Sequence, residues 1–409
     1  MKMLKVDTVA GAKEKMDQYF SDLKLNNEEI DIFDSLGRII AEDIFSPCHI
    51  PEFNRSTVDG YALIAKDTFG ASDSLPVFLD LTGKVEMGQA TDLTIAPGEA
   101  VYVPTGGMLP KGADAVVMVE YVEELDENTI AVHRPSAPGE GMIIIGEDLK
   151  KGDLLLNKGQ KIKPQDIGAL AAVGITKIAV FEKPRVAVVS TGDEIVEPDG
   201  EVPFGKIRDI NTYALAAMAR ELGAIITYQD LVRDDFQELK ARLLSLIDNN
   251  HIVIISGGSS VGTKDVTARV IDYLGSPGTF VHGVAIKPGK PTIIGRAGHT
   301  ALFGLPGHPV SAMIVFKIFT GYLIKKLYCQ ESQEEITIPA TVDANIHAAP
   351  GKETYQMVTL EGREGNYTAK PVYGKSGAIS LMTRAHGFVR IEHNKEGIKK
   401  GEKVQVNLF

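Results

Sequence analysis

Two loops rich in glycine and serine, each close to carboxylates, follow apolar runs that are typical of buried strands. The run 185–190 ends in Thr191-Gly192-Asp193-Glu194, directly after Ser190. The run 251–255 ends in Ser256-Gly257-Gly258-Ser259-Ser260-Val261-Gly262, and Asp265 follows. Ligands of open α/β sheets bind at the carboxyl ends of strands, glycine lets backbone N–H groups approach phosphate, and carboxylates hold hard cations such as Mg²⁺. The two loops therefore predict a nucleotide or phosphate-ester site with a metal.

A third loop carries two lysines between prolines, in the order Lys287-Pro288-Gly289-Lys290-Pro291. Because proline restricts the backbone, this loop fixes the two charges relative to each other. A solvated charge pair needs no such rigidity, whereas a clamp for phosphate or another oxyanion does. A fourth loop, 305–312, contains Pro306, follows the strand-like run 300–304 and opens a helix at Pro309. Its His308 alone is weak evidence for chemistry, although free N–H groups at a helix start can bind an anion.

Each of the remaining acidic motifs also has a purely structural explanation. Asp59-Gly60 and Gly146-Glu147-Asp148 can be ordinary turns, and Thr191–Glu194 can be an Asx turn or a helix N-cap. In Arg233-Asp234-Asp235, helix capping accounts for one of the two aspartates and leaves the other without a structural reason.

The composition excludes several classes of protein. The 409 residues include 43 basic and 54 acidic side chains, and the net charge of −11 argues against a general binder of nucleic acid or of anionic membranes. Two cysteines, Cys48 and Cys329, exclude a disulfide framework and a cysteine metal site. The sequence has no apolar stretch near the ~18 residues of a membrane span and no signal-peptide pattern, so we expect a cytoplasmic protein.

The secondary structure that the sequence predicts changes several times along the chain. Asp7 is predicted to cap a helix that runs to about Leu23, and a broken helical pattern covers 28–44. Short strand-like pieces fill the region up to 139, and 163–174 predicts a short helix closed by glycine. Between 184 and 328, strands (185–190, 224–229, 251–255, 300–304) alternate with helices (212–222, 236–248, 266–274, 309–327), which predicts a mainly parallel α/β sheet. Residues 335–409 read as a small β-barrel or sandwich.

Taken together and in this order, the motifs closely resemble those of the molybdopterin molybdenumtransferase family, the molybdenum-insertion enzymes that are similar to the E domain of gephyrin. The resemblance covers residues 7 to 409 and rests on these segments: 53–62, 104–106, 146–148, 190–194, 209–211, 233–235, 256–265, 286–291 and 305–312. It is strongest in the α/β segment and weakest after residue 330.

The resemblance implies a multidomain α/β plus β fold in a homodimer. Residues 1–50 and 140–180 would form a helical and extended domain in two segments, and 51–139 an inserted β-rich domain. Residues 181–329 would form the α/β molybdopterin-binding domain and 330–409 a C-terminal β-barrel. The implied reaction uses adenylylated molybdopterin and molybdate, needs Mg²⁺ and releases AMP.

The resemblance also assigns site residues. The catalytic acids would be Asp59, Asp148, Glu194, Asp234 and Asp265, of which Glu194, Asp234 and Asp265 are the expected metal ligands. The expected substrate-binding residues are Thr105, Ser190, Gly192, Asp193, Gly257, Gly258, Ser259, Lys287, Lys290, Pro306 and Ser376. Sequence alone does not decide which carboxylates bind the metal.

The chain departs from the family pattern at three places. Ile143, Ile144 and Ile145 stand where many relatives have basic residues, Lys352 replaces a frequent arginine, and His308 stands where asparagine is frequent. Lysine keeps the charge but loses the planar fork of arginine, which puts oxyanion binding by Lys352 in question.

Three other functions remain open from the sequence. One is the preceding step, adenylyl transfer onto molybdopterin, and the adenylyltransferase that catalyses it is also a potential partner. Because that enzyme is a single compact domain, a chain of 409 residues with flanking β-rich regions favours the insertion enzyme instead. The others are a scaffold that keeps the fold without catalysis, which the acidic set disfavours, and a sugar or nucleotide phosphotransferase.

Overall fold

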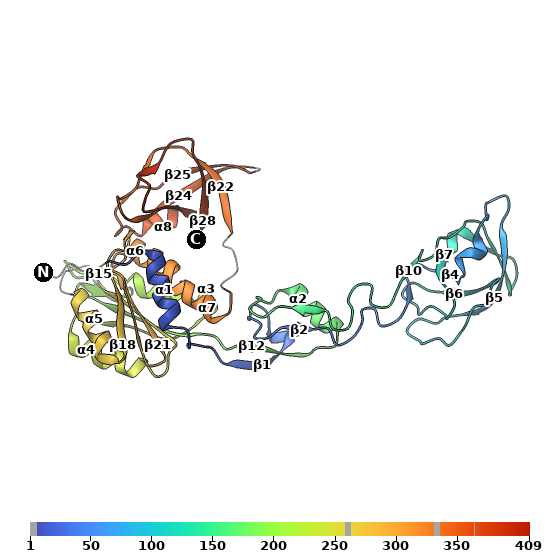
Figure 1. The fold of residues 1–409 in the computed structure, drawn as a ribbon, viewed down its shortest axis with the longest axis horizontal. Coiled ribbons are helices and arrows are strands. Elements are labelled where there is room, and N and C mark those ends of the chain that lie inside the picture. The colour runs from blue at the N-terminus through green and yellow to red at the C-terminus, as the bar shows by residue number, and fades with distance from the viewer. Residues whose placement is uncertain (1–5, 258–262, 331–335, 364) are drawn as a thin grey trace. The chain divides into compact units, whose positions relative to one another are not determined.

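The computed structural model describes residues 6–257, 263–330, 336–363 and 365–409 (Figure 1). The chain divides into two compact units. The first contains Met1–Glu28, Gly37–Ala41 and Val180–Phe409, and the second contains Glu29–Leu36 and Glu42–Ala179. Strands β1 (Asn27–Asp31) and β12 (Lys177–Phe181) lie where the chain passes between the units.

A six-stranded sheet with the order β16-β13-β17-β21-β20-β18 forms the centre of the first unit. Four strands are parallel, and β20 and β18 add to β21 in antiparallel fashion. The strands are β13 (Arg185–Thr191), β16 (Ile225–Val232), β17 (Ile252–Gly257), β18 (Pro277–His282), β20 (Ile293–Ala297) and β21 (Thr300–Pro306). This arrangement confirms the predicted α/β domain, whereas the two antiparallel strands were not predicted.

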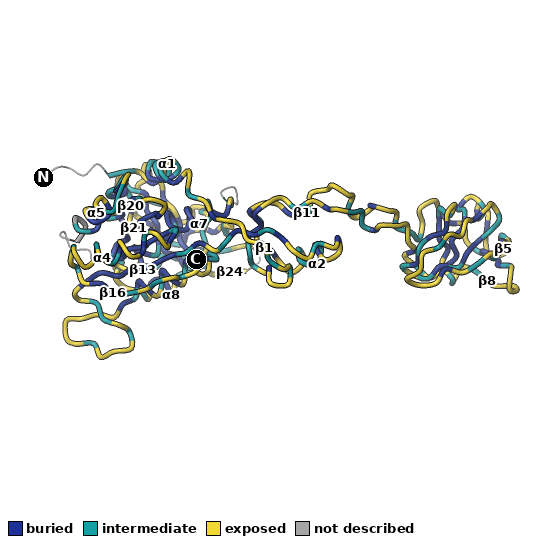
Figure 2. The backbone as a smooth tube through the Cα atoms, turned by 90° about the horizontal axis from the view of Figure 1, so that it is seen from below, coloured by how far each residue is buried: buried dark blue, intermediate teal, exposed yellow. Residues whose placement is uncertain are grey.

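Helices cover both faces of this sheet because its strands are apolar on both sides. Ala187 and Val189 pack with α4 (Phe236–Leu246) and α5 (Thr263–Leu274) in one buried cluster. The alternate residues Val186 and Val188 are fully buried too, and α3 (Asn211–Glu221) packs against β13 and β16. The helical stretch after β21 consists of α6 (Pro309–Val315), a π-helical turn (Phe316–Thr320) and α7 (Gly321–Leu327). In Figure 2 the strands β13 and β21 are mostly buried, whereas α4 carries an exposed face.

The C-terminal part of the first unit is a closed five-stranded barrel. Its strands pair in the order β24-β25-β22-β28-β26, and β26 pairs back onto β24. The strands are β22 (Thr337–Val342), β24 (Glu353–Arg363), β25 (Asn366–Pro371), β26 (Gly387–Ile391) and β28 (Lys403–Leu408). Val342, Val358, Ala369, Val389 and Val406 fill its interior. The multidomain α/β plus β fold class is thus confirmed.

The second unit is built around a six-stranded sheet with the order β7-β4-β6-β5-β9-β8. Its strands are β4 (Gly60–Leu63), β5 (Val77–Lys84), β6 (Glu99–Val103), β7 (Ala115–Met118), β8 (Val122–Glu124) and β9 (Thr129–Val132). Apolar clusters lie on both faces, one containing Leu63 and Ile130 and the other containing Ala62 and Val101.

Shorter elements complete both units. In the second unit these are β2 (Ile44–Phe45), β3 (Arg55–Ser56), β10 (Met142–Ile143), β11 (Leu154–Leu156), α2 (Pro164–Ala172) and the 3₁₀ turns Ile32–Asp34, Ala65–Thr68 and Val119–Tyr121. In the first unit they are α1 (Val9–Tyr19), β14 (Ile195–Val196), β15 (Ile207–Arg208), β19 (Ile286–Lys287), β23 (Ile346–His347), β27 (Gly397–Ile398) and α8 (Ser380–Arg384).

Two local predictions near the N-terminus were wrong. Thr8 caps α1 by accepting a hydrogen bond from the Gly11 backbone at 3.0 Å, and Asp7 instead forms an ion pair with Lys15 at 2.8 Å. The expected helical pattern over 28–44 contains strand β1 and a 3₁₀ turn. Backbone pairing with a distant segment overrides the helical pattern in this region, since the Ile32 N–H donates to the Thr176 carbonyl oxygen at 3.0 Å.

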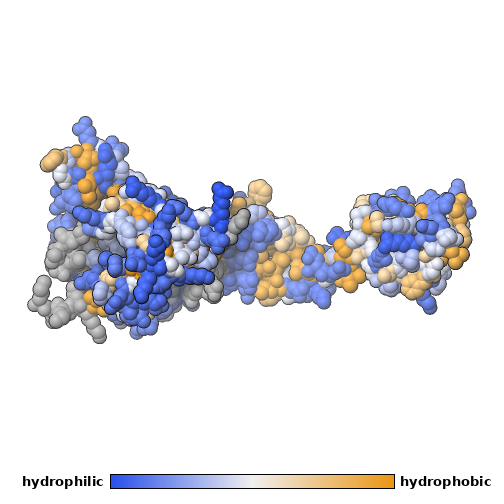
Figure 3. All heavy atoms as spheres, turned by 90° about the horizontal axis from the view of Figure 1, so that it is seen from above, coloured by the Kyte–Doolittle hydropathy of each residue, from blue (hydrophilic) through white to orange (hydrophobic). Residues whose placement is uncertain are grey.

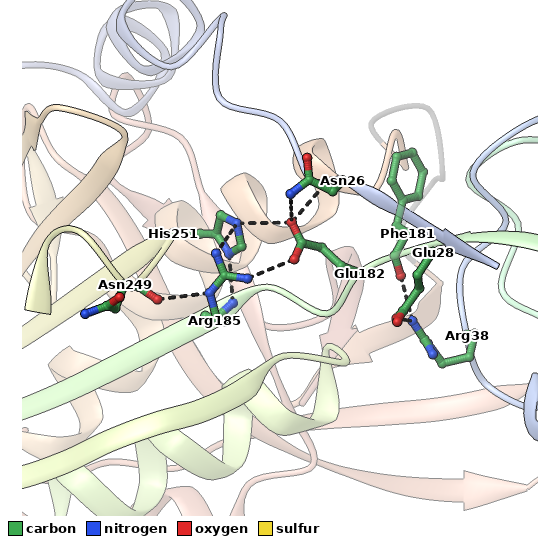
Figure 4. Close-up of polar contacts among 8 residues, drawn as sticks. All are labelled: Asn26, Glu28, Arg38, Phe181, Glu182, Arg185, Asn249 and His251. Atoms are coloured by element: carbon green, nitrogen blue, oxygen red, sulfur yellow. Dashed lines mark hydrogen bonds and ion pairs between the residues drawn. The ribbon is translucent and has the colours of Figure 1, made fainter. Parts of the chain in front are cut away.

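A polar network fixes the beginning of β13 (Figure 4). The Arg185 guanidinium donates to Glu182 at 2.8 Å, and the Arg185 backbone N–H donates to Nδ1 of His251 at 2.9 Å. The Asn26 backbone N–H donates to the other oxygen of Glu182 at 2.9 Å. Burial, followed by the nearby charge of Arg185, lowers the pKa of His251, so the imidazole stays neutral and accepts at Nδ1.

The face shown in Figure 3 is mostly hydrophilic, with several groups of apolar residues on it. Among the described residues, no helix is both long enough and apolar enough to cross a membrane.

Candidate active site

Four loops begin side by side at one edge of the central sheet. Thr191 at the end of β13 lies opposite Val232 of β16 on one side and Gly257 of β17 on the other, and Gly257 lies opposite Pro306 of β21. The chain order reverses between β13 and β17, because β16, the next strand of this sheet in sequence after β13, lies on the other side of β13. Such a switch point leaves a crevice where ligands of doubly wound sheets bind. The sheet therefore gathers the acidic, glycine-rich and histidine-containing loops at a binding edge.

Three carboxylates cluster above the strands β13 and β16. Burial raises the pKa of Asp234, and the charges of Asp193 and Glu194 raise it further. A Cβ atom on Gly192 would lie 2.9 Å from Oε2 of Glu194, so glycine gives that carboxylate room to fold back over the loop. Asp235 is the residue that caps α4, by accepting from the Gln237 and Glu238 backbones at 2.9 and 3.0 Å. Asp234 is thus the aspartate that capping leaves available for chemistry.

A buried hydrogen-bond network supports this edge from below. Ser190 is fully buried, donates to Asp209 at 3.2 Å and accepts from the Thr212 hydroxyl at 2.7 Å. Asn211 donates through Nδ2 to Ser256 at 2.7 Å and to the Gly307 carbonyl oxygen at 2.8 Å. The network ties the ends of β13, β17 and β21 together. The Ser190 side chain therefore acts on the loop geometry through its neighbours.

Sequence reasoning missed the role of Asn211, although the motif 209–211 was noted. Asn211 is 7% exposed, and its Oδ1 has no hydrogen-bond partner among the described residues. The bond from Nδ2 to a carbonyl oxygen fixes the orientation of the amide, because Oδ1 cannot replace a donor there. Oδ1 of Asn211 is thus a buried hydrogen-bond acceptor at the switch point, without a partner among the described residues.

A basic cavity of about 630 Å³ lies between the edge of the sheet and the barrel. The lining includes Lys287, Lys290 and Lys352, and it also includes His308 and His347. Within the described chain, no aspartate or glutamate lines this cavity. Three lysines without a carboxylate concentrate positive charge in this cavity, although the chain as a whole has a net charge of −11. Pro306 and Ser376, both predicted to bind substrate, line it as well.

The barrel holds the lysine loop in place. Strand β19 adds to β24 in parallel, with Ile286 opposite Glu353 and Lys287 opposite Thr354. Gly289 has φ +116°, and a Cβ atom there would lie 2.5 Å from Val315 and 2.8 Å from Ile286. Its carbonyl oxygen accepts from the Thr292 hydroxyl at 2.7 Å. The rigidity expected from the prolines is therefore reinforced by strand pairing and close packing.

Ser376 reaches the cavity from the barrel side and bonds to the loop after β21. Its hydroxyl lies 2.8 Å from Nδ1 of His308, and its carbonyl oxygen accepts from the Val310 backbone N–H at 3.2 Å. The two bonds join the wall of the cavity that comes from the α/β domain to the wall that comes from the barrel.

Three predicted site residues belong to the second unit. Asp59 accepts from the Thr105 backbone at 2.7 Å and from the Thr105 hydroxyl at 3.1 Å, so these two predicted residues are neighbours. Asp148 is exposed, and its backbone N–H donates to the Ile50 carbonyl oxygen at 3.0 Å. Ile144 and Ile145 are also exposed.

Some predicted residues cannot be placed. Gly258 and Ser259 lie outside the described residues, and so does the side chain of Asp265 at the start of α5. Among the described residues, no three histidine, cysteine or acidic side chains are grouped as a complete metal site. Mg²⁺ usually binds through one or two carboxylates together with substrate phosphates and water, so Glu194 and Asp234 suit it as a partial set.

Comparisons with known protein families account for most of the chain. Residues 8–174 match the MoeA N-terminal region, domains I and II, residues 187–326 match a probable molybdopterin-binding domain, and residues 339–409 match the MoeA C-terminal region, domain IV.

Individual relatives are similar over nearly their whole length. A molybdopterin biosynthesis protein of Methanocaldococcus jannaschii is 36% identical over 97% of this chain and 95% of its own. The molybdopterin molybdenumtransferase of Bacillus subtilis is 31% identical over 93% and 90%. Among solved structures, a MoeA protein of Pyrococcus horikoshii is 40% identical with a TM-score of 0.85, covering 99% of both chains.

Proposed function

The chain belongs to the molybdopterin molybdenumtransferase family, and we propose that it inserts molybdenum from molybdate into adenylylated molybdopterin with release of AMP. As members of a family of transferases, such enzymes act in molybdenum-cofactor biosynthesis. The observation that carries the proposal is the basic cavity beside the switch point of the sheet. It supplies one site for an oxyanion next to another for a phosphate ester.

Molybdate is a tetrahedral dianion, and an acidic protein repels it unless positive charge is concentrated locally. Lys287, Lys290 and Lys352 provide that charge as compact ammonium groups, and Ser376 adds a hydroxyl. The lysine at 352 in place of a frequent arginine keeps the charge, and the strand pairing of β19 with β24 keeps it near Lys287. These residues would hold molybdate while the pterin sulfurs attack.

The acidic loops would hold the nucleotide part of the substrate. Loop backbones after β13 and β17 would bind the phosphates, with Gly192, Gly257 and Gly258 giving close approach and Asp193 and Ser259 giving polar contacts. Burial raises the pKa of Asp234, and the neighbouring charges of Asp193 and Glu194 raise it further; a cation bound there would offset that negative charge. A bound Mg²⁺ would neutralise charge on the phosphate oxygens during cleavage. Glu194, Asp234 and Asp265 are the residues that we propose to hold it.

The second unit would complete the site. The family resemblance assigns Asp59, Thr105 and Asp148 to the site, and we propose that they act across the two-fold axis of a homodimer. The domain limits 1–50 with 140–180, 51–139, 181–329 and 330–409 belong to the same proposal, as do a cytoplasmic location and delivery of substrate by the molybdopterin adenylyltransferase.

Variants of the acidic loops test this function. Glu194→Ala and Asp265→Ala should each abolish molybdate-dependent AMP release, while the circular dichroism spectrum and the melting temperature stay close to those of the wild type. Glu197→Ala is a matched control, because Glu197 lies in the same segment but its carboxylate accepts a hydrogen bond from the Tyr213 hydroxyl at 3.3 Å. Normal AMP release by both acidic-loop variants would refute the assignment.

A further inference from the structure

His308 stands in the wall of the basic cavity and contacts a residue from another domain. It immediately precedes α6, and its Nδ1 lies 2.8 Å from the hydroxyl oxygen of Ser376. The next turn reinforces this contact, because the Val310 backbone N–H donates to the Ser376 carbonyl oxygen at 3.2 Å. Ser376, which lines the cavity, is therefore held at two atoms, its hydroxyl oxygen and its carbonyl oxygen.

The direction of the bond between His308 and Ser376 decides what the cavity offers to a ligand. A hydroxyl has one proton and two lone pairs, and an imidazole nitrogen either donates or accepts, depending on the tautomer. If Nδ1 accepts, the serine proton points at His308 and the cavity meets only oxygen lone pairs, which repel an anion. If Nδ1 carries a proton and donates, the serine proton is free to point into the cavity.

The charges around the cavity select the second arrangement when an anion is bound. Lys287, Lys290 and Lys352 attract an oxyanion, and the oxyanion accepts from whatever donors surround it. We infer that His308 is a positioning residue for the oxyanion, which donates from Nδ1 to Ser376 and so directs the Ser376 hydroxyl proton toward the ligand. This inference rests on the proposed function and names a residue that acts through Ser376.

The surroundings of His308 distinguish a positioning role from a role in packing the protein interior. The His308 side chain is exposed, so it contributes little buried apolar surface. Gly377 follows Ser376, and a Cβ atom on Gly377 would lie 3.8 Å from Cδ2 of His308, which is ordinary van der Waals contact. His347, the other histidine of the cavity, comes from β23 on the barrel and serves as a matched control.

The test measures binding of molybdate by calorimetry, with AMP as a second titrant, in the full-length protein. His308→Leu should weaken binding of the oxyanion by about 3- to 10-fold, the value of one ordinary hydrogen bond. His308→Asn should restore most of the affinity, because the Asn amide can donate from nearly the same place. His308→Asp can only accept, so it should bind less well than His308→Leu.

A double-mutant cycle shows whether His308 acts through Ser376. In a Ser376→Ala background, His308→Leu should cause no further loss, because the hydroxyl that His308 directs is gone. His347→Leu should add its own effect in either background. If His308→Leu weakens the binding of molybdate, the ligand that Ser376 contacts is the free oxyanion. If it weakens the binding of AMP, that ligand is the nucleotide phosphate. Either result supports the inference.

Three outcomes would each overturn a different claim. If the wild type binds molybdate and His308→Leu binds both titrants equally well, the positioning role is wrong while the proposed function stands. If the effects of His308→Leu and Ser376→Ala add fully, His308 does not act through Ser376. If the wild type binds neither molybdate nor AMP, the proposed function fails and this inference fails with it.

Discussion

Removing one lysine charge from the basic cavity should raise the molybdate concentration needed for half-maximal turnover. In Lys290→Gln the side chain keeps a similar length but loses its ammonium group. At a separation of ~4 Å, two unit charges interact by about 1 kcal/mol in water and about 4 kcal/mol at the effective dielectric constant of a protein surface. Lys290 is exposed, so the lower part of this range applies. About 1–2 kcal/mol corresponds to roughly a 5- to 30-fold rise in the half-saturating concentration.

The assay follows AMP release against molybdate concentration at two ionic strengths. Because added salt screens exposed charges, the difference between Lys290→Gln and the wild type should shrink as the salt concentration rises. Lys183→Gln is the control, since Lys183 is an exposed lysine that precedes β13, at the opposite end of the strand from the loops. Seven strand residues span about 20 Å, well beyond the ~8 Å over which salt screens a charge. A molybdate response of Lys290→Gln that matches the wild type within twofold would refute the role of the cavity.

Three further predictions follow from particular contacts. Because the pKa of His251 is lowered in the folded chain, the unfolded chain takes up a proton first as the pH falls below about 6.5, and stability declines toward pH 5. His251→Asn should flatten that decline in thermal melts, and equal slopes would contradict the burial argument. Gly289→Ala should destabilise the protein by about 1–3 kcal/mol and weaken molybdate binding, whereas Gly298→Ala, at a positive φ in open space, should leave molybdate binding intact. Mixed Asp59→Ala and Asp265→Ala subunits should regain activity, and demonstrable but inactive heterodimers would exclude a site shared between subunits.

The edge of the central sheet could be predicted from sequence because the information is local. Apolar runs that stop at glycine, serine and aspartate mark strand ends, and parallel strands bring those ends to one side. The structure places these strand ends side by side, because adjacent strands pair at the residues Thr191, Val232, Gly257 and Pro306. The capping argument also predicted that one of the two aspartates at 234 and 235 caps the helix, and the structure shows that Asp235 is the one that caps α4.

What could not be predicted depends on contacts between distant segments. The addition of β19 to β24 joins residues 286–287 to 353–354, and nothing in either short segment marks it as a strand partner. The bond between His308 and Ser376 likewise joins residues whose separate sequence signals are weak. At the N-terminus, Asp7 and Thr8 are both good caps, and the choice of Thr8 follows from the ion pair that Asp7 makes with Lys15.

The most direct test of the central claim is a single-turnover reaction of the purified protein with adenylylated molybdopterin, Mg²⁺ and molybdate. AMP released and molybdenum incorporated into the pterin product are measured in the same samples, by chromatography and by mass spectrometry. The account predicts one AMP for each molybdenum inserted, and little AMP when molybdate is omitted. AMP release that proceeds equally without molybdate, or release without incorporation of molybdenum, would contradict it.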